Sequence, residues 1–319
     1  DTYNIAVGYN AGAAVTTGVR NIVIGGHAGD ALTIGLHNVA IGYKALSTSV
    51  DGDENVAIGY LALEDYEDGD GNGHNTAVGA RSQREATTGE FNTSLGSLSM
   101  GVGVVTGDAN VAVGYNAGSA LTSGIKNILI GKDAGDSLTS GNFNIAIGTD
   151  ALQTEDGHGK NIAIGHAALE VLNAGADGNN VAIGYSAGTA MTTGVQNTIV
   201  GSLAGDALTT GSFNAALGYN SLGATTIGAK NTAIGNFALN ENVRTNNNVA
   251  IGQQALQSLV GDGSTDNQET YNTAVGYFAG KEITTGINNT LIGGLSGDAL
   301  TTGVSNTAVG MNALGSAII

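Results

Sequence analysis

Short apolar triplets alternate with glycine and asparagine along the whole chain, and the pattern returns about every 17 residues. A clear copy is Asn110-Val-Ala-Val-Gly-Tyr-Asn-Ala-Gly-Ser-Ala-Leu-Thr-Ser-Gly-Ile-Lys126, after which Asn127 starts the phrase again. With the asparagine counted as position 0, eighteen copies begin at Asn4, Asn21, Asn38, Asn55, Asn75, Asn92, Asn110, Asn127, Asn144, Asn161, Asn180, Asn197, Asn214, Asn231, Asn248, Asn272, Asn289 and Asn306. Self-similarity at a short fixed period is typical of a solenoid. We therefore predict that each copy forms one coil of a β-solenoid.

Four intervals are longer than 17 residues, by three after Asn55, one after Asn92, two after Asn161 and seven after Asn248. The repeat resumes in frame after each insertion, which indicates that the insertions are loops. The most variable segments are acidic and rich in Gly or Asn: 47–54, 64–74, 155–160, 170–179, 240–247 and 257–271. We expect them to be exposed on one edge of the solenoid, where repeat proteins vary their surface.

Positions +1 to +3 of each copy have the pattern of a short β-strand. Position +3 is aliphatic in every copy and position +1 is Ile, Val, Thr or Ala, so these two side chains share one face. We expect that face to be the inside of the coil, with the mostly Ala position +2 facing outward. Position +4 is Gly in all eighteen copies, which predicts a corner with positive φ or a close backbone approach.

The remaining positions predict how one coil closes. Position +7 is always Ala or Ser and indicates a second short strand, while Gly at +14 in thirteen of the seventeen complete copies indicates a turn. The Asn at position 0 suits left-handed backbone at a corner and a stacked amide ladder. Coils stacked at about 4.8 Å would form a rod of roughly 85 Å. Two sheets about 10 Å apart leave no room for a buried pocket. An α-helix is disfavoured, because each fixed glycine would cost about 1 kcal/mol there.

Position +8 divides the copies into two classes. Eight copies, the Gly coils, have Gly12, Gly29, Gly118, Gly135, Gly188, Gly205, Gly280 and Gly297 there. Eight others, the Leu coils, have Leu, and Gln83 and Met100 complete the set. Gly coils always come in pairs. The second coil of each pair has a larger residue at +2 (Val23, Leu129, Ile199, Leu291) and Asp at +9 (Asp30, Asp136, Asp206, Asp298).

These correlated changes indicate that position +2 fits against specific neighbours. If +1 and +3 fill the coil, +2 forms a continuous outward apolar stripe, which soluble monomers rarely expose. We therefore predict that chains pack against one another through this stripe, as a homotrimer. The alternative is that +2 lies against the other strand of its own coil.

Composition and charge narrow the function. Fifty-three Gly, no Pro, Trp or Cys and only 12% charged residues describe tight turns and small side chains in one repeat domain over residues 1–319. A formal net charge of -17 with only ten Lys and Arg disfavours a nucleic-acid partner. No segment resembles a signal peptide or a membrane span. Because the chain starts and stops inside the repeat, we expect it to be a fragment of a longer fibre.

Candidate catalytic chemistry is weak. Gly184-Tyr-Ser-Ala-Gly188 matches the nucleophile-elbow pattern, but Ser186 stands where Asn10 and Phe278 stand in equivalent coils, so the match is an accident of the repeat. The five histidines occupy unrelated repeat positions and form no ligand spacing or triad. A solenoid enzyme such as a polysaccharide lyase would need a groove with clustered acids, bases and aromatics. We therefore predict that the protein is not an enzyme and has no catalytic or cofactor-binding residue.

Acidic loops raise the question of calcium. Asp68-Gly-Asp-Gly-Asn-Gly73 begins like a calcium loop, but Gly79 stands at the twelfth position, where a bidentate Glu is needed. The segments 51–53 and 262–266 match less well. We predict no metal ligand and expect solvated loops, with weak calcium binding in them as the open alternative. The four Asp at +9 are expected to form turns.

The repeat resembles a known family of surface proteins. Asn38-Val-Ala-Ile-Gly-Tyr-Lys-Ala-Leu46 and Asn272-Thr-Ala-Val-Gly-Tyr277 resemble the left-handed β-roll head repeats of trimeric autotransporter adhesins. They are also similar to repeats in fibre-like proteins of bacteria and their phages. The resemblance covers essentially the whole chain, which differs in its 17-residue period and paired Gly coils. No binding residue of the family maps onto this sequence.

The resemblance implies a left-handed, homotrimeric, rod-like fibre that is extracellular, on a cell surface or virion, and meets a surface receptor or matrix. The expected function is therefore a structural or adhesive fibre for surface attachment, and the alternative is a phage tail fibre for host attachment. An ice-binding solenoid is less favoured. Thr recurs at +12 in most complete copies, but the Leu coils interrupt the row.

Overall fold

The computed structural model describes residues 2–67, 73–264 and 267–315. The described residues form β-strands and turns and no helix. The chain divides into two compact units, Asp1–Lys160 and Asn161–Ile319, and each holds nine of the eighteen coils. Each unit is a parallel β-solenoid with a coil of about 17 residues, which confirms the predicted all-β solenoid, while its left hand and homotrimeric state stay predictions. The units are described separately, and one domain over residues 1–319 stays a prediction.

Each coil contributes one three-residue strand at positions +1 to +3. The first unit contains β1 (Ile5–Val7), β2 (Ile22–Ile24), β3 (Val39–Ile41), β4 (Val56–Ile58), β5 (Thr76–Val78), β6 (Thr93–Leu95), β7 (Val111–Val113), β8 (Ile128–Ile130) and β9 (Ile145–Ile147). The second contains β10 (Ile162–Ile164), β11 (Val181–Ile183), β12 (Thr198–Val200), β13 (Ala215–Leu217), β14 (Thr232–Ile234), β16 (Val249–Ile251), β18 (Thr273–Val275), β19 (Thr290–Ile292) and β20 (Thr307–Val309). The loop after Asn240 and the seven-residue insertion add β15 (Thr245–Asn246) and β17 (Gln268–Glu269), which pair with each other.

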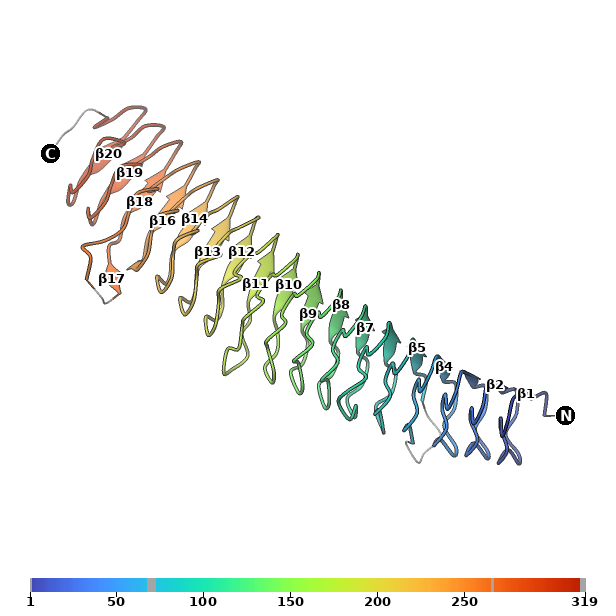
Figure 1. Cartoon of the computed structure of the whole chain (residues 1–319). Coiled ribbons are helices and arrows are strands. Elements are labelled where there is room, and N and C mark those ends of the chain that lie inside the picture. The colour runs from blue at the N-terminus through green and yellow to red at the C-terminus, as the bar shows by residue number, and fades with distance from the viewer. Residues whose placement is uncertain (1, 68–72, 265–266, 316–319) are drawn as a thin grey trace. The chain divides into compact units, whose positions relative to one another are not determined.

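Neighbouring strands within a unit pair in parallel and in register (Figure 1). Ala112 at +2 of β7 lies opposite Leu129 at +2 of β8, and the same match recurs between the other paired strands. Each repeat position therefore forms a column that runs from coil to coil, as the regular spacing predicted.

The side chains at +2 point into the coil, and those at +1 and +3 point out of it. Position +2 is buried in every strand of this set except β1, whereas no side chain at +1 or +3 is buried. The prediction that +1 and +3 fill the interior was therefore wrong. The alternative was right that +2 faces inward, but position +7 opposite it lies in a turn and not in a second strand. The interior is narrow: Ser94 at +2 hydrogen-bonds Ser82 at +7 of the preceding coil. Only small side chains such as Ala fit at both positions over most of the length.

The glycine at +4 has the expected geometry. Its φ lies between 126° and 142° in all eighteen coils, a region that side chains disfavour. A Cβ on Gly114 would lie 2.4 Å from the carbonyl oxygen of Gly131 in the next coil. Both predicted reasons for glycine, positive φ and close approach, are confirmed.

Three further positions, -1, +6 and +8, are left-handed in every coil, mostly at residues other than glycine. Leu203 (φ 56°) and Leu222 (φ 54°) are examples at +6 and +8. Their backbone N–H groups donate to carbonyls of adjacent coils, Tyr185 at 2.9 Å and Ala238 at 3.0 Å. Position +7 therefore lies in a turn between two left-handed residues. The predicted second strand at +7 was wrong, although its small buried side chain was right.

The asparagines form the predicted amide ladder. Asn127 Oδ1 accepts the backbone N–H of Asn144 at 2.9 Å, and Asn127 Nδ2 donates to the carbonyl of Gly141 at 2.8 Å. The left-handed residue at this corner is the one before the asparagine, here Lys126 (φ 58°). Glycine at +14 allows the backbones of adjacent coils to approach closely: a Cβ on Gly124 would lie 2.5 Å from the carbonyl oxygen of Gly141.

The Gly coils and Leu coils fill the same space differently. A Cβ on Gly118 would lie 2.6 Å from the Leu129 side chain, and one on Gly135 would lie 2.8 Å from it. One large residue at +2 thus occupies the room left by two glycines at +8, which explains why Gly coils are paired. In the Leu coils, a buried leucine such as Leu46 occupies that place. The predicted fit of +2 against specific neighbours is real, but those neighbours lie inside the solenoid.

Candidate functional site

The largest candidate surface is the exposed side of the strands. The side chains at +1 and +3 stand in columns along it, because +2 takes the interior and the strands pair in register. Position +3 is aliphatic in every coil, yet Leu95 and Leu217 are each 50% exposed. Figure 1 shows the strands of each unit lined up along one side of its coils. We call positions +1 and +3, together with the flanking positions -1, +5 and +6, the strand face.

Aromatic side chains gather at the two ends of the strands, at -1, +5 and +6. Fourteen of the fifteen Tyr and Phe residues stand there, none of them buried: Tyr3, Tyr9, Tyr43, Tyr60, Phe91, Tyr115, Phe143, Tyr185, Phe213, Tyr219, Phe237, Tyr271, Tyr277 and Phe278. The remaining one, Tyr66, is buried inside a Leu coil. Some rings stack from coil to coil, with centroids 5.8 Å apart for Tyr43 and Tyr60. The narrow interior cannot hold these rings at most positions.

Charge is also divided unequally between the strand face and the rest of the coil. Seven of the ten basic residues belong to the strand face: Arg20, Lys44, Arg81, Lys126, Lys132, Lys160 and Lys230. Only three of the 27 acidic residues do: Glu54, Asp133 and Asp150. The strand face therefore carries 7 - 3 = +4, and all other positions carry 3 - 24 = -21, which together give the net -17. The acidic charge lies almost entirely on the turns and loops.

Several basic residues of the strand face contact neighbouring side chains of that face. Arg20 Nη1 lies 3.1 Å from His37 Nε2, and the Lys126 ammonium lies 5.5 Å from the ring centre of Phe143. Lys132 donates a hydrogen bond to Asp133, and this bond raises the pKa of Lys132. The cations are held beside the aliphatic columns by interactions within the chain.

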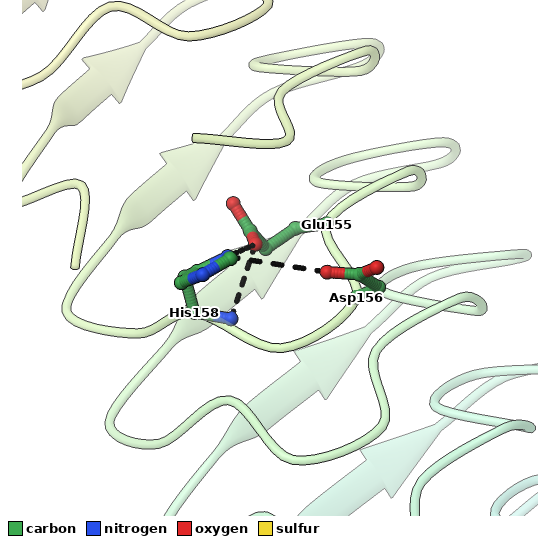
Figure 2. Close-up of side chains that lie close together, drawn as sticks. All are labelled: Glu155, Asp156 and His158. Carbon is green, nitrogen blue, oxygen red and sulfur yellow. Dashed lines mark hydrogen bonds and ion pairs between the residues drawn. The ribbon is translucent and has the colours of Figure 1, made fainter. Parts of the chain in front are cut away.

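A second candidate is a cluster of Glu155, Asp156 and His158 in a Leu coil of the first unit (Figure 2). Their ligand atoms lie within 4.8 Å of one another, and these three residue types can hold a cation. His158 Nδ1 lies 3.0 Å from Glu155 Oε1 and 3.9 Å from Asp156 Oδ1. The sequence prediction treated His158 only by its repeat position and missed these neighbours. The adjacent letters Glu-Asp-Gly-His were the available signal.

The role of Glu155 within the coil accounts for most of this cluster. Its fully buried carboxylate, at position +11, accepts a hydrogen bond from the backbone N–H of His158, at position +14, with a distance of 3.1 Å. Ser49 accepts the N–H of Gly52 at the same repeat positions. Asn242 likewise accepts the N–H of Thr245 at 2.9 Å. In these three Leu coils the polar residue at +11 therefore caps the following turn, whereas the buried Thr225 hydroxyl at the same position has no hydrogen-bond partner.

A third candidate is a hollow of about 300 Å³ in the second unit, lined by Val243, Arg244, Val260, Gly261, Gly263 and Ser264. It lies beside β15 and β17, where the longest insertion leaves the coil. Arg244 is the one charged group among the residues that line it.

The structure places the motifs singled out in the sequence as follows. Ser186 occupies the left-handed position +6 (φ 51°), with no adjoining helix among the described residues. The Asp68–Gly73 motif lies almost wholly outside the described residues. Asp53 accepts the N–H of Leu36 at 2.6 Å, and burial raises the pKa of Asp53. Asp262 accepts the N–H of Ser264 at 2.9 Å. The absence of catalytic and metal-binding residues stays a prediction.

Comparisons with known proteins give no neighbour. No protein-family model matches the chain, and no curated protein or solved structure does so either. The described residues contain no helix with the length and hydrophobicity that a membrane span requires.

Proposed function

We propose that the chain is part of a structural and adhesive extracellular fibre that mediates surface attachment. The observation that carries this proposal is the division of each coil into an apolar, aromatic strand face and an acidic, variable loop side. The aromatic residues and the scarcity of acidic ones on the strand face fit association between fibre chains, because protein interfaces are enriched in aromatic residues and depleted in acidic ones. The loops vary in length without disturbing the coils, as a binding surface on a fixed scaffold requires.

A homotrimer is part of the proposal, as is the left-handed winding that the family resemblance implies. Exposed aliphatic columns on both units favour association, because water is released when such surfaces are covered. The test is the mass of the purified chain in solution at micromolar concentration. Three chains per particle would support the fibre, whereas a single chain at every concentration would contradict it.

Attachment itself can be tested with beads coated with the whole chain. We expect retention of the beads on surfaces coated with extracellular matrix proteins if the fibre is an adhesin. Retention on isolated bacterial envelopes instead would favour the alternative, a phage tail fibre for host attachment. Retention on neither surface, with uncoated beads as the control, would contradict an attachment function.

An ice-binding solenoid is a weaker candidate, suggested by paired Thr at +12 and +13 of several Gly coils. The hydroxyl at +12 already donates to the carbonyl of the next coil, as from Thr122 to Thr139 at 3.0 Å. The column is also broken in the Leu coils, for example by Val243 and Val260. Thermal hysteresis of a concentrated solution tests this function, and we expect none. A calcium titration followed by calorimetry tests weak binding in the acidic loops.

A further inference from the structure

We propose that the strand face is the surface through which copies of this chain contact one another. The aliphatic columns at +1 and +3 would form the middle of the contact, and positions -1, +5 and +6 its two margins. This inference rests on the proposed fibre in one respect only, that copies associate. It replaces the +2 stripe, which the structure buries inside the coil.

The strand face is large enough for a stable contact. The seven steps from position -1 to +6, at no more than about 3.3 Å each, and nine coils at about 4.8 Å each give an upper limit of about 1,000 Å² for one unit. A stable protein interface covers about 800 Å² on each partner. The exposed side chains on this area include Ile183 (37%), Leu217 (50%) and Ile292 (41%). Covering them with a second strand face would remove these apolar columns from water.

Charge favours a second copy on this face and opposes one on the loop side. Two loop sides brought together would each carry a share of -21, and like charges repel at close range. Two strand faces carry only a small positive excess, and their few acidic groups lie next to bases, as Asp133 lies next to Lys132. Association through the strand face would turn the acidic loops outward, where water and salt screen them.

The regular columns suit a contact between identical chains. Because strands pair in register, the same aliphatic position recurs at each step of about 4.8 Å along a unit. A second copy carries the same spacing, so the aliphatic ridges of two copies can match over many coils. Closed homo-oligomers repeat one contact around an axis, and a surface that is continuous along the unit meets that need.

The first experiment introduces charge on the strand face. The double variant Leu217→Glu and Ile251→Glu changes two exposed +3 positions of the second unit. The matched control is Thr193→Glu and Thr210→Glu, two exposed +13 positions on the loop side. Sedimentation should show at least a tenfold rise in the dissociation constant for the strand-face variant and no change for the control. Circular dichroism checks that both variants keep the wild-type fold.

A second measurement tests the contact without placing a charge on the strand face. The chain has no cysteine, so Leu217→Cys and Thr210→Cys each provide one thiol for labelling. In the assembled protein, we expect a maleimide to react at position 217 at least tenfold more slowly than at position 210. The difference should vanish when the protein is diluted to single chains.

The outcomes separate the two proposals. An assembled protein that resists the strand-face charges and labels equally at both positions would overturn this inference and leave the fibre standing. A wild-type chain that is monomeric throughout would overturn both, and the face would then be open for another kind of ligand.

Discussion

The Gly coils and the Leu coils share one backbone but pack their interiors in different ways. Both have glycine at +4, asparagine at position 0 and left-handed residues at -1, +6 and +8. A Leu coil fills its interior with its own +8 leucine, whereas a pair of Gly coils shares one large side chain such as Leu129. At +11, Gly coils bury an aliphatic residue such as Leu138, and Leu coils often bury a polar cap such as Ser49. The backbone hydrogen bonds therefore define the coil, and the side chains adapt to it.

Replacement of the +4 glycine should have the largest effect and should be the same in both classes. A Cβ would lie 2.4 Å from a backbone carbonyl oxygen at Gly131 in a Gly coil and 2.2 Å from one at Gly42 in a Leu coil. With the strain at positive φ, we expect Gly131→Ala and Gly42→Ala each to cost about 3 kcal/mol or more. Urea unfolding measures this, and an effect confined to one class would show that the shared backbone is not the common element.

Position +11 should separate a Gly coil from a Leu coil that has a polar cap there. Leu138→Ala removes a fully buried side chain from a Gly coil and should cost about 3 kcal/mol, because a cavity remains. Ser49→Ala removes the cap on Gly52 in a Leu coil and should cost about 1 kcal/mol. Equal losses in thermal or urea unfolding would contradict the proposed difference in packing.

Converting a Gly coil towards a Leu coil tests the shared side chain. Gly135→Leu places a side chain where Leu129 already lies, and the overpacking should cost about 2 kcal/mol. Most other coils have Ala at +2. Adding Leu129→Ala to Gly135→Leu should therefore recover at least half of the lost free energy of unfolding. A double variant that is no more stable than Gly135→Leu alone would rule out this coupling.

The smallest expected effect concerns Asp206, at the +9 position characteristic of the second Gly coil. Burial raises the pKa of Asp206, although backbone hydrogen bonds oppose the shift. The folded state therefore holds this proton more tightly than the unfolded state, so the stability contribution of Asp206 falls as the pH rises above the carboxyl's ordinary range. Asp206→Asn should flatten the fall in stability that begins as the pH rises above about 4, the ordinary pKa of an Asp carboxyl. An unchanged pH profile would contradict this role.

Much of the fold could be predicted because a few residue types at fixed repeat positions are compatible with only one local geometry. Glycine at +4, as at Gly114, and the ladder that includes Asn127 follow from close backbone approach and from amide geometry. The inner face could not be predicted in the same way. Alternation shows that Ala112 and Val113 face opposite ways but not which one faces in, and hydrophobicity alone favours valine. The interior of the coil is so narrow that the small alanine faces inward and the valine faces outward.

The left-handed turns and the candidate surfaces could not be predicted from the sequence for a related reason. Leucine, phenylalanine and arginine avoid left-handed backbone when isolated, so Leu203, Phe213 and Arg20 gave no sign of it. Hydrogen bonds between coils impose that geometry. The strand face appears only once +1 and +3 are known to point outward. Likewise, Glu155 is recognised as a turn cap only once +11 is known to point inward.

The asparagine ladder gives each unit a direction. Asn127 Oδ1 accepts a hydrogen bond from the backbone N–H of Asn144, and Asn110 Oδ1 accepts one from that of Asn127, so in both bonds the acceptor belongs to the earlier coil. A finished coil thus presents a ready acceptor to the residues that come after it. In a chain that folds from its amino end, each new coil would meet this acceptor on the coil already in place. The column that holds the coils together therefore also distinguishes the two ends of a unit, one that presents an acceptor and the other that presents a donor.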